Sequence, residues 1–380
     1  MTRHRTDIAI LGGGIIGWSL AWHLKKSKPA LGVLVIDPTP DQASILRGTG
    51  GARSQFATEV NIRLSLKSLG ALRRFSEETG YDIDWTPSGY LMVSAREERL
   101  DLLRRYAAMQ NRLGGRTKVL GPDELEPWQS VLRTDDLVGA TFSSLDGLFH
   151  GPKLLVGLME SAMKSGVRTL KRSVTGLGEG GLATDDGEIA CRAAVVAAGH
   201  GSWALAKLLG VRLNLVSERH QLYRVAPADR LGIEWPESLP MVVDADTSFH
   251  FRRRDTELLL GFDDPAIRVE EKEPQAQPEF DPSGIERMCQ AAAIRSPQLS
   301  LQPDQVEGWA GWYTRTPDGA PIVDWVKPSI LALVGLGGHG GMHSLALGEW
   351  GAKMILEGQP GPAEFRFKRG KSAEEAELKL

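Results

Sequence analysis

The sequence predicts a mixed α/β fold, in which a parallel sheet built from separated stretches of chain is interleaved with an antiparallel sheet. Three apolar runs, at the start, in the middle and near the end of the chain, have the composition of strands buried on both faces, and each runs into glycine. The first and last runs continue into segments with helical spacing. Less regular, extended segments separate the runs, as expected where a second sheet is inserted.

The N-terminal third opens with a strand–helix–strand unit, the usual start of a parallel sheet. A longer helix is expected further on, because its apolar residues lean to one face and Gly80 suits a helix C-terminus. The elements expected here are strands over 7–11, 32–36 and 89–95, and helices over 15–26, 58–80 and from 96 to Gly114 or Gly115.

In the middle of the chain, Pro152 marks the first turn of a helix within residues 146–166, since proline suits that position. The segment Asp185-Asp186-Gly187, between two short apolar strands, indicates a hairpin. The buried strand that follows ends at Gly199.

Residues 213–305 are expected to be β-like and irregular, with a hairpin in "SFHFRRRDTELLLGF". We expect Phe249 and Phe251 to pack in the core; the alternative is that one face of this strand covers the substrate pocket. The basic run "HFRRR" is expected to be a solvated strand edge instead of a binding patch. Residues 330–358 repeat the order of the chain's start: a buried strand, a glycine-rich turn and a helix.

Composition is typical of a soluble globular protein, since 42% of the 380 residues are hydrophobic and 24% are charged. The net charge of −3 gives no basis for a nucleic-acid or anionic-membrane partner. No window reaches the roughly 18 apolar residues that span a bilayer, and peripheral membrane attachment is left open. Cys191 and Cys289 have neither CxxC nor metal-ligand spacing, so we expect packing cysteines, no metal site and a cytoplasmic location.

The first glycine turn, "GGGIIG", fits the G-x-G-x-x-G pattern of a dinucleotide-binding turn; the alternative is a glycine-rich turn of another βα protein. The glycines permit a tight turn, close approach of backbone to a pyrophosphate, and close packing of helix on strand. An aspartate 20 residues beyond the last glycine suits the ribose hydroxyls. The predicted contacts are Gly12, Gly14, Ile15, Ile16, Gly17, Asp37 and Pro38.

These elements predict two interleaved domains, a Rossmann-like dinucleotide-binding domain and an antiparallel substrate domain. The charged C-terminal tail is either a short helix or frayed. The ranges are 1–80, 150–212 and 306–362 for the first domain, 81–149 and 213–305 for the second, and 363–380 for the tail.

A second glycine-rich turn, "GLGGHGGMHS" at residues 335–344, indicates which dinucleotide is bound. An NAD-linked dehydrogenase needs no second helix N-terminus at the far end of its chain. Two-electron reduction of a flavin leaves negative charge on its pyrimidine end, and a helix N-terminus stabilises such charge by up to ~2 kcal/mol. The two turns together favour FAD.

The chain resembles the FAD-dependent D-amino-acid oxidase superfamily, in the branch of the sarcosine oxidases and amino-acid dehydrogenases. The resemblance spans about residues 6–360 and rests on ordered motifs that include "DIAILGGGIIG", "RGTGGARSQF", "AAVVAAGHGSWA", "GWAGWYTRTPDGAPIVD" and "GLGGHGGMHSLALGEWGAKMIL". It implies that the segment "SILRGTGGAR" borders the pyrophosphate, the ribityl chain and the flavin edge. The further FAD contacts it implies are Ser44, Arg47, Gly50, Gly51, Val174, Ala198, Gly199, Gly311, Gly338, Gly340, Gly341 and Met342.

Two departures from the family pattern concern the flavin. Some family oxidases hold FAD through a cysteine at the position of Gly311, so noncovalent FAD is expected here. Some carry a lysine over the flavin, associated with oxygen activation, at the position that we pair with Leu259. Its absence favours a dehydrogenase, although other family oxidases also lack it.

Catalytic candidates are limited, because the cofactor supplies the reactive atom and no side-chain acid or base is required. Arginine binds carboxylates in a bidentate manner, so Arg53 and Arg315 are candidates; the alternatives are an FAD contact or a structural role for Arg53 and a surface position for Arg315. Tyr313 is either a donor to a substrate carboxylate or a packed tyrosine. His339 and His343 flank the second turn, where a histidine polarises the flavin, assists amine deprotonation or caps the helix; of the two, His339 is the candidate.

The predicted function is oxidation of a small amino acid or secondary amine, of the sarcosine, proline or opine type, by hydride transfer to FAD and hydrolysis of the imine. The alternatives are a D-amino-acid dehydrogenase and a flavoprotein that serves as an accessory or assembly subunit. An NAD-linked enzyme would be colourless when purified. The electron acceptor (oxygen, a quinone or a partner protein) and homo- or hetero-oligomeric assembly are left open.

Overall fold

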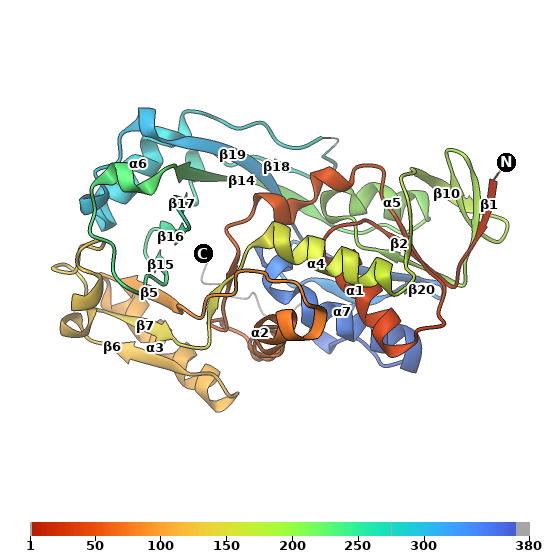
Figure 1. The fold of residues 1–380 in the computed structure, drawn as a ribbon, viewed down its shortest axis with the longest axis horizontal. Helices are drawn as coiled ribbons and strands as arrows, with labels where there is room; N and C mark the ends of the chain where they lie inside the picture. The colour runs from red at the N-terminus through yellow and green to blue at the C-terminus, as the bar shows by residue number, and fades with distance from the viewer. Residues whose placement is uncertain (1, 275, 370–380) are drawn as a thin grey trace.

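The computed structural model describes residues 2–274 and 276–369, and it confirms the predicted mixed α/β fold. Figure 1 shows a largely parallel sheet with its helices in the right part of the view and a large, mostly antiparallel sheet in the left part. No helix in either described range is both long and apolar enough to cross a membrane.

The parallel sheet has the strand order β20-β21-β13-β2-β3-β9, in which β20 runs antiparallel to its neighbour. Helices α1, α4 and α7 cover one face, and the four-stranded sheet β1-β12-β11-β10 with α5 covers the other. The central strands β2, β3, β13 and β21 are apolar along their whole length, as expected for strands that are buried on both faces of the sheet. The bounds are β1 Thr2–Arg5, β2 Ile8–Leu11, β3 Val33–Ile36, β9 Arg168–Leu170, β10 Val174–Gly178, β11 Gly181–Thr184, β12 Gly187–Ala190, β13 Ala193–Val196, β20 Ile322–Lys327, β21 Ile330–Val334, α1 Ile15–Ser27, α2 Glu59–Thr79, α4 Gly151–Lys164, α5 Ser202–Leu208 and α7 Gly340–Glu357.

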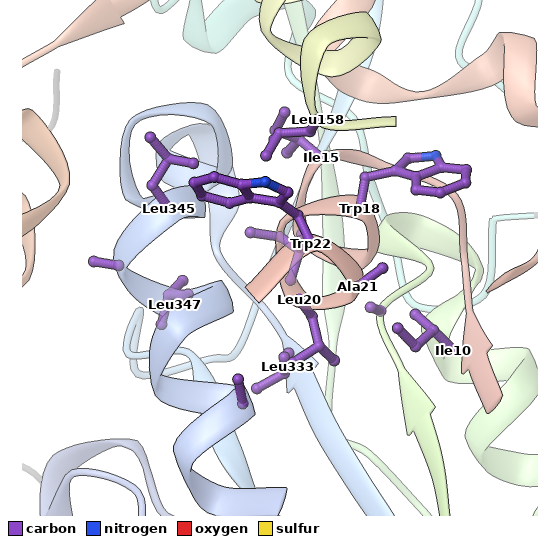
Figure 2. Packing of buried hydrophobic residues seen from close by; sticks show 14 of the residues in the cluster. Ile10, Ile15, Trp18, Leu20, Ala21, Trp22, Leu158, Leu333, Leu345 and Leu347 are labelled. Carbon is purple, nitrogen blue, oxygen red and sulfur yellow. The ribbon is translucent and has the colours of Figure 1, made fainter. Parts of the chain in front are cut away.

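Helices α1 and α7 pack directly against each other above this sheet. In Figure 2 the Trp22 ring of α1 points toward Leu345 of α7. The Ser19 hydroxyl donates a hydrogen bond to the Ser344 carbonyl at 2.8 Å. A Cβ on Gly348 would collide with Ser19, so this glycine is what permits the close approach of the two helices.

The second sheet has the order β18-β14-β17-β16-β15-β5-β7-β6, and β19 pairs with β14. Most pairs are antiparallel, as predicted, but β15 and β5 are parallel. Its outer face is apolar and packs against α6. The bounds are β5 Tyr90–Ser94, β6 Thr117–Leu120, β7 Gly139–Ser143, β14 Val216–Val225, β15 Met241–Asp244, β16 His250–Arg254, β17 Glu257–Gly261, β18 Glu270–Glu271, β19 Glu307–Arg315, α3 Glu97–Arg112 and α6 Gly284–Arg295, with a separate pair of short strands, β4 Gly51–Ala52 and β8 Gly147–Leu148.

Three elements differ from expectation. Helix α6 lies in a region expected to be irregular, and it is stabilised by contacts of Met288 and Ala292 with the sheet rather than by a strong local signal. Strand β1 forms in the polar N-terminal segment because its backbone pairs in parallel with the edge strand β12. Strand β19 belongs to the antiparallel sheet, whereas the sequence assigns residues 306–362 to the other domain.

Cys191 and Cys289 carry free, partly buried thiols, and each packs against a hydrophobic cluster. Burial raises the pKa of both thiols, which suits packing positions rather than reactive ones. In the expected C-terminal tail, residues 370–380 lie outside the described part of the chain.

Gly348→Ala should destabilise the protein, because the added methyl group overlaps Ser19 and forces α1 and α7 apart. We expect a loss of about 1–3 kcal/mol in the free energy of unfolding, as at other overpacked positions, measured by chemical unfolding. Gly70→Ala is the matched control, since a Cβ there meets only the end of Arg74 at 3.6 Å and alanine favours a helix over glycine. An unchanged unfolding midpoint for Gly348→Ala would contradict this packing.

Candidate active site

The first glycine turn joins β2 to α1 in the geometry that its sequence pattern requires. Gly12 has φ = +113°, which other residues rarely adopt, and a Cβ there would lie 2.5 Å from the Ala197 carbonyl oxygen. A Cβ on Gly17 would collide with the Gly12 carbonyl oxygen. The start of α1 is thereby held close to the ends of β2 and β13.

The N-terminus of α1 has room for a ligand. No side chain caps it, its first turn has no acidic residue, and a Cβ on Gly14 would meet nothing within 4 Å. Free N–H groups at such a helix end bind phosphate. Directly after β3, the Asp37 carboxylate accepts hydrogen bonds from the backbone N–H groups of Gly13 at 2.6 Å and Thr39 at 2.8 Å. This pair of features fits a dinucleotide, with phosphate at the helix and ribose at the carboxylate.

Four of the predicted stretches meet at one edge of the parallel sheet. Strands β3, β2, β13 and β21 are neighbours and parallel, so the turns after them share the carboxyl edge, where ligands of such sheets bind. Helix α7 starts here with neither a capping side chain nor an acidic residue in its first turn. The predicted residues at this edge are Gly12, Gly14, Ile15, Ile16, Gly17, Asp37, Pro38, Ala198, Gly199, Gly338, Gly340, Gly341 and Met342.

The segment after β3 that is expected to border the flavin, here called the flavin loop (residues 44–53), connects the two sheets. Arg47 donates from Nη1 to the Ala310 carbonyl of β19 at 3.1 Å. On the other side, a Cβ on Gly341 at the start of α7 would lie 2.7 Å from Ile45 Cδ1. The flavin loop therefore contacts both the antiparallel sheet and the start of α7.

Arg53 ends the flavin loop and is only 5% exposed. Its guanidinium donates to the Gln55 carbonyl and lies 4.0 Å over the Phe56 ring, and its Nη2 is 3.5 Å from His339 Nε2. Burial, and then the charge of Arg53, hold the pKa of His339 well below its usual value. His339 is therefore a neutral imidazole beside a guanidinium at neutral pH.

Strand β16 shows which side chains the antiparallel sheet turns toward the flavin loop. Because side chains alternate along a strand, Phe249 and Phe251 point into the core against α6, as predicted, and His250 and Arg252 point to the opposite face. Arg252 is only 5% exposed, so the prediction that its basic run is a solvated edge is wrong for this residue.

This opposite face, here called the inner face, carries polar and aromatic residues. The His220 ring stacks on the Tyr313 ring with centroids 3.9 Å apart and planes 19° apart. A Cβ on Gly51 in the flavin loop would collide with the Tyr90 hydroxyl. By sheet register the inner face includes Tyr90, His220, His250, Arg252, Leu259 and Tyr313.

Arg315 lies on the inner face, two residues after Tyr313 in β19, but it is bound to carboxylates. Its Nη2 is 3.0 Å from Glu218 and 2.7 Å from Glu270. A hydrogen bond from His220, together with Arg315 and Arg268, lowers the pKa of Glu218 to about 2. With two carboxylates already in contact, Arg315 is not favoured as a ligand for a substrate carboxylate.

Sequence reasoning missed Asp146, a fully buried carboxyl behind the end of the flavin loop. It accepts hydrogen bonds from both the backbone N–H and the hydroxyl of Ser54 at 2.7 Å, and so fixes the residue after Arg53. Burial raises the pKa of Asp146 to about 6. A single aspartate in a turn carries no local signal for such a role.

The remaining predicted residues lie in different elements, and Val174 belongs to the four-stranded sheet on the other face of the parallel sheet. A Cβ on Gly199 would be 4.0 Å from the Ser44 hydroxyl, which brings those two stretches together. Val174 begins β10, Gly311 lies in β19 opposite His220, and Gly50 precedes β4. Within the described ranges no group of three His, Cys, Asp or Glu side chains suits a metal ion.

Comparison with known proteins identifies the family. The model of the FAD dependent oxidoreductase family, DAO, matches residues 7–354. The chain belongs to this family. Glycine oxidase, dimethylglycine dehydrogenase and sarcosine dehydrogenase are among its relatives, and the carboxyl-edge geometry fits the cofactor that the family uses.

Three relatives show how far the similarity extends. FAD-dependent oxidoreductase domain-containing protein 1 of Xenopus laevis is 28% identical, over 93% of this chain and 80% of its own length. Dimethylglycine dehydrogenase of Rattus norvegicus is 24% identical, over 94% of this chain and 44% of its own. The structure of glycine oxidase from Geobacillus kaustophilus has a TM-score of 0.81 at 22% identity and covers 97% of this chain and 100% of that one; that likeness concerns the fold.

Acidification should destabilise the protein through buried histidines. Burial lowers the pKa of His343 to about 3 and that of His23 to about 4. In the unfolded chain these imidazoles bind a proton near pH 6.5 while the native ones do not, so stability falls as the pH falls below about 6.5. The raised pKa of Asp146 acts in the opposite direction between about pH 4 and 6, because the native carboxyl binds its proton first.

His343→Gln should weaken this dependence, and glutamine can keep a hydrogen bond with Ser65, whose hydroxyl is 2.7 Å from His343 Nε2. Between about pH 6.5 and 4.5 the loss in free energy of unfolding should shrink by about 2 kcal/mol, since one such histidine contributes about 1.4 kcal/mol per pH unit. Urea unfolding at both pH values measures the difference. Equal losses in the two proteins would mean that His343 binds its proton in the native state as readily as in the unfolded chain.

Proposed function

We propose that the protein is a dehydrogenase that oxidises a small amino acid or secondary amine with noncovalently bound FAD. Substrates of this kind carry a carboxylate near the amine, as sarcosine-, proline- and opine-like compounds do. The chemistry that FAD supplies when bound is acceptance of a hydride from the carbon beside nitrogen, after which the imine hydrolyses to a carbonyl compound.

The observation that carries the proposal is the meeting of Arg53, His339 and the inner face at the carboxyl edge of the parallel sheet. Arginine binds carboxylates through two parallel hydrogen bonds. Tyr90 lies close enough to Arg53 and Tyr313 for both to influence its pKa, which burial raises. The Arg53 guanidinium, with the Tyr90 and Tyr313 hydroxyls nearby, suits the carboxylate of a substrate, which is an anion and accepts hydrogen bonds.

His339 is assigned a positioning role in this site. A pKa so far below the usual value makes its imidazole a poor base for the substrate ammonium. Its Nε2 faces Arg53 Nη2 at 3.5 Å, so as a hydrogen-bond acceptor it orients the guanidinium. Deprotonation of the amine is then left to solvent before binding.

The finer properties of the flavin site follow from two residues. Gly311, at the position where some family members attach FAD through cysteine, supports noncovalent binding. Leu259, at the position that we pair with the oxygen-associated lysine, is a buried apolar residue of the inner face. This supports an acceptor other than oxygen. The names of the glycine and dimethylglycine relatives support an amine substrate.

The purified protein should be yellow, with flavin absorbance that acid precipitation releases into the supernatant. Acid breaks the noncovalent contacts but leaves a carbon–sulfur link intact. Spectra of supernatant and pellet measure the partition. A yellow pellet would contradict noncovalent binding, and a colourless protein that takes up no added FAD would contradict the proposed function.

Anaerobic mixing with a panel of amines should bleach the flavin with at least one carboxylated amine. Glycine, sarcosine, N,N-dimethylglycine, L-proline and D- and L-amino acids form the panel, and amines without a carboxylate are the control. Faster turnover with a quinone or dye than with oxygen is expected for a dehydrogenase. Bleaching by D-amino acids alone would indicate the D-amino-acid alternative, and no bleaching at all would favour an accessory flavoprotein.

Arg53→Met should lower kcat/KM for the bleaching substrate by about 100-fold or more, because a charge-assisted bidentate contact contributes about 3 kcal/mol or more when buried. The bound flavin should be retained. Arg192→Met, at a surface arginine whose side chain is 72% exposed, is the matched control and should change kcat/KM less than twofold. Equal activity of the two variants would remove Arg53 from substrate binding.

A further inference from the structure

Arg252 is a buried cation that the proposed reaction does not use. Its Nη1 donates to the carbonyls of Thr49 at 3.0 Å, Gly50 at 3.1 Å and Phe149 at 3.4 Å. None of the ion pairs found among the described residues includes Arg252, and the charges of Asp255 and Asp84 act on it from beyond ion-pair distance. Desolvation lowers the pKa of Arg252 to about 10, so the group is still charged at neutral pH.

The three carbonyls lie where the flavin loop is hydrogen-bonded to the segment before α4. Thr49 and Gly50 are in the flavin loop, and the Phe149 N–H donates to the Gly50 carbonyl at 2.7 Å just before α4 begins. A Cβ on Gly341 would lie 3.3 Å from the Phe149 ring, which places this contact against the start of α7. A single guanidinium therefore links β16, the flavin loop and the approach to α4.

On the facing strand β17, the carboxylate on the same face as Arg252 is Glu257, and it pairs with Arg254 and Arg224 instead of with Arg252. Leu259 of β17 is the register partner of Arg252 and is apolar. Tyr90, from β5, covers Gly51 on the same side of the flavin loop. The acceptors that hold the Arg252 guanidinium are neutral carbonyls. A charge in such a buried region acts over several ångströms with little screening by solvent.

We propose that Arg252 is a positioning residue that clamps residues 49–51 to the antiparallel sheet and places a positive charge behind the loop that borders the flavin. The charge part of this inference rests on the proposed cofactor site, and the clamp part does not. Reduction adds negative charge to the flavin, so a fixed cation behind its edge favours the reduced state.

Hydrogen exchange of the full-length protein, as purified, tests the clamp. In Arg252→Met, amides of residues 49–53 should exchange at least tenfold faster than in wild type, because three carbonyls lose their donor. Arg253→Met is the matched control: that side chain points to the other face, pairs with Asp229 at 3.0 Å and lies over Trp235. It should change exchange less than twofold. Unchanged exchange in Arg252→Met overturns the clamp.

FAD affinity and the two-electron midpoint potential test the charge. Arg252→Met should weaken FAD binding at least tenfold and lower the potential, whereas Arg252→Lys, which keeps the charge but not the planar fork, should restore the potential while exchange stays faster than in wild type. Equal potentials in wild type and Arg252→Met overturn the charge role. If Arg252→Met does not fold, wild-type exchange in Arg252→Lys overturns the clamp. A wild type that binds no flavin defeats the proposed function, and exchange still decides the clamp.

Discussion

The close approach of α1 to the ends of β2 and β13 is the constraint on which the site depends. Gly12 and Gly17 allow that approach, and no side chain caps the helix that results. An uncapped helix end presents N–H groups and the positive end of a dipole, which a phosphate satisfies. Helix α7 packs tightly on α1 through Gly348. The N-terminus of α7, which no side chain caps, therefore lies at the same edge of the sheet.

The flavin loop converts this edge into a site shared by both sheets. Arg53 closes one end of the loop against His339, and Arg252 reaches the middle of it from the inner face. Buried guanidinium groups cost several kcal/mol in desolvation unless their hydrogen bonds are satisfied. The structure places two such groups around one loop, where a reaction that adds negative charge to a cofactor would benefit from them.

The two faces of the antiparallel sheet have different roles. The outer face is apolar, packs on α6 and supplies stability. The inner face carries the stacked His220 and Tyr313 and the buried Arg252, whose charge an apolar core would exclude. Alternation along each strand lets a single sheet meet both requirements.

Local patterns were enough to predict the two glycine-rich βα turns and Gly80 at the end of α2, because glycine conformation and apolar periodicity act over a few residues. They were not enough for α6, for the burial of Arg252 or for the carboxylates around Arg315, since each depends on partners far along the chain. Strand register alone brings Glu218 to Arg315, and register is a property of the assembled sheet. The local sequence thus specified the glycine turns at the carboxyl edge of the parallel sheet, and long-range strand pairing determined which side chains lie beside them.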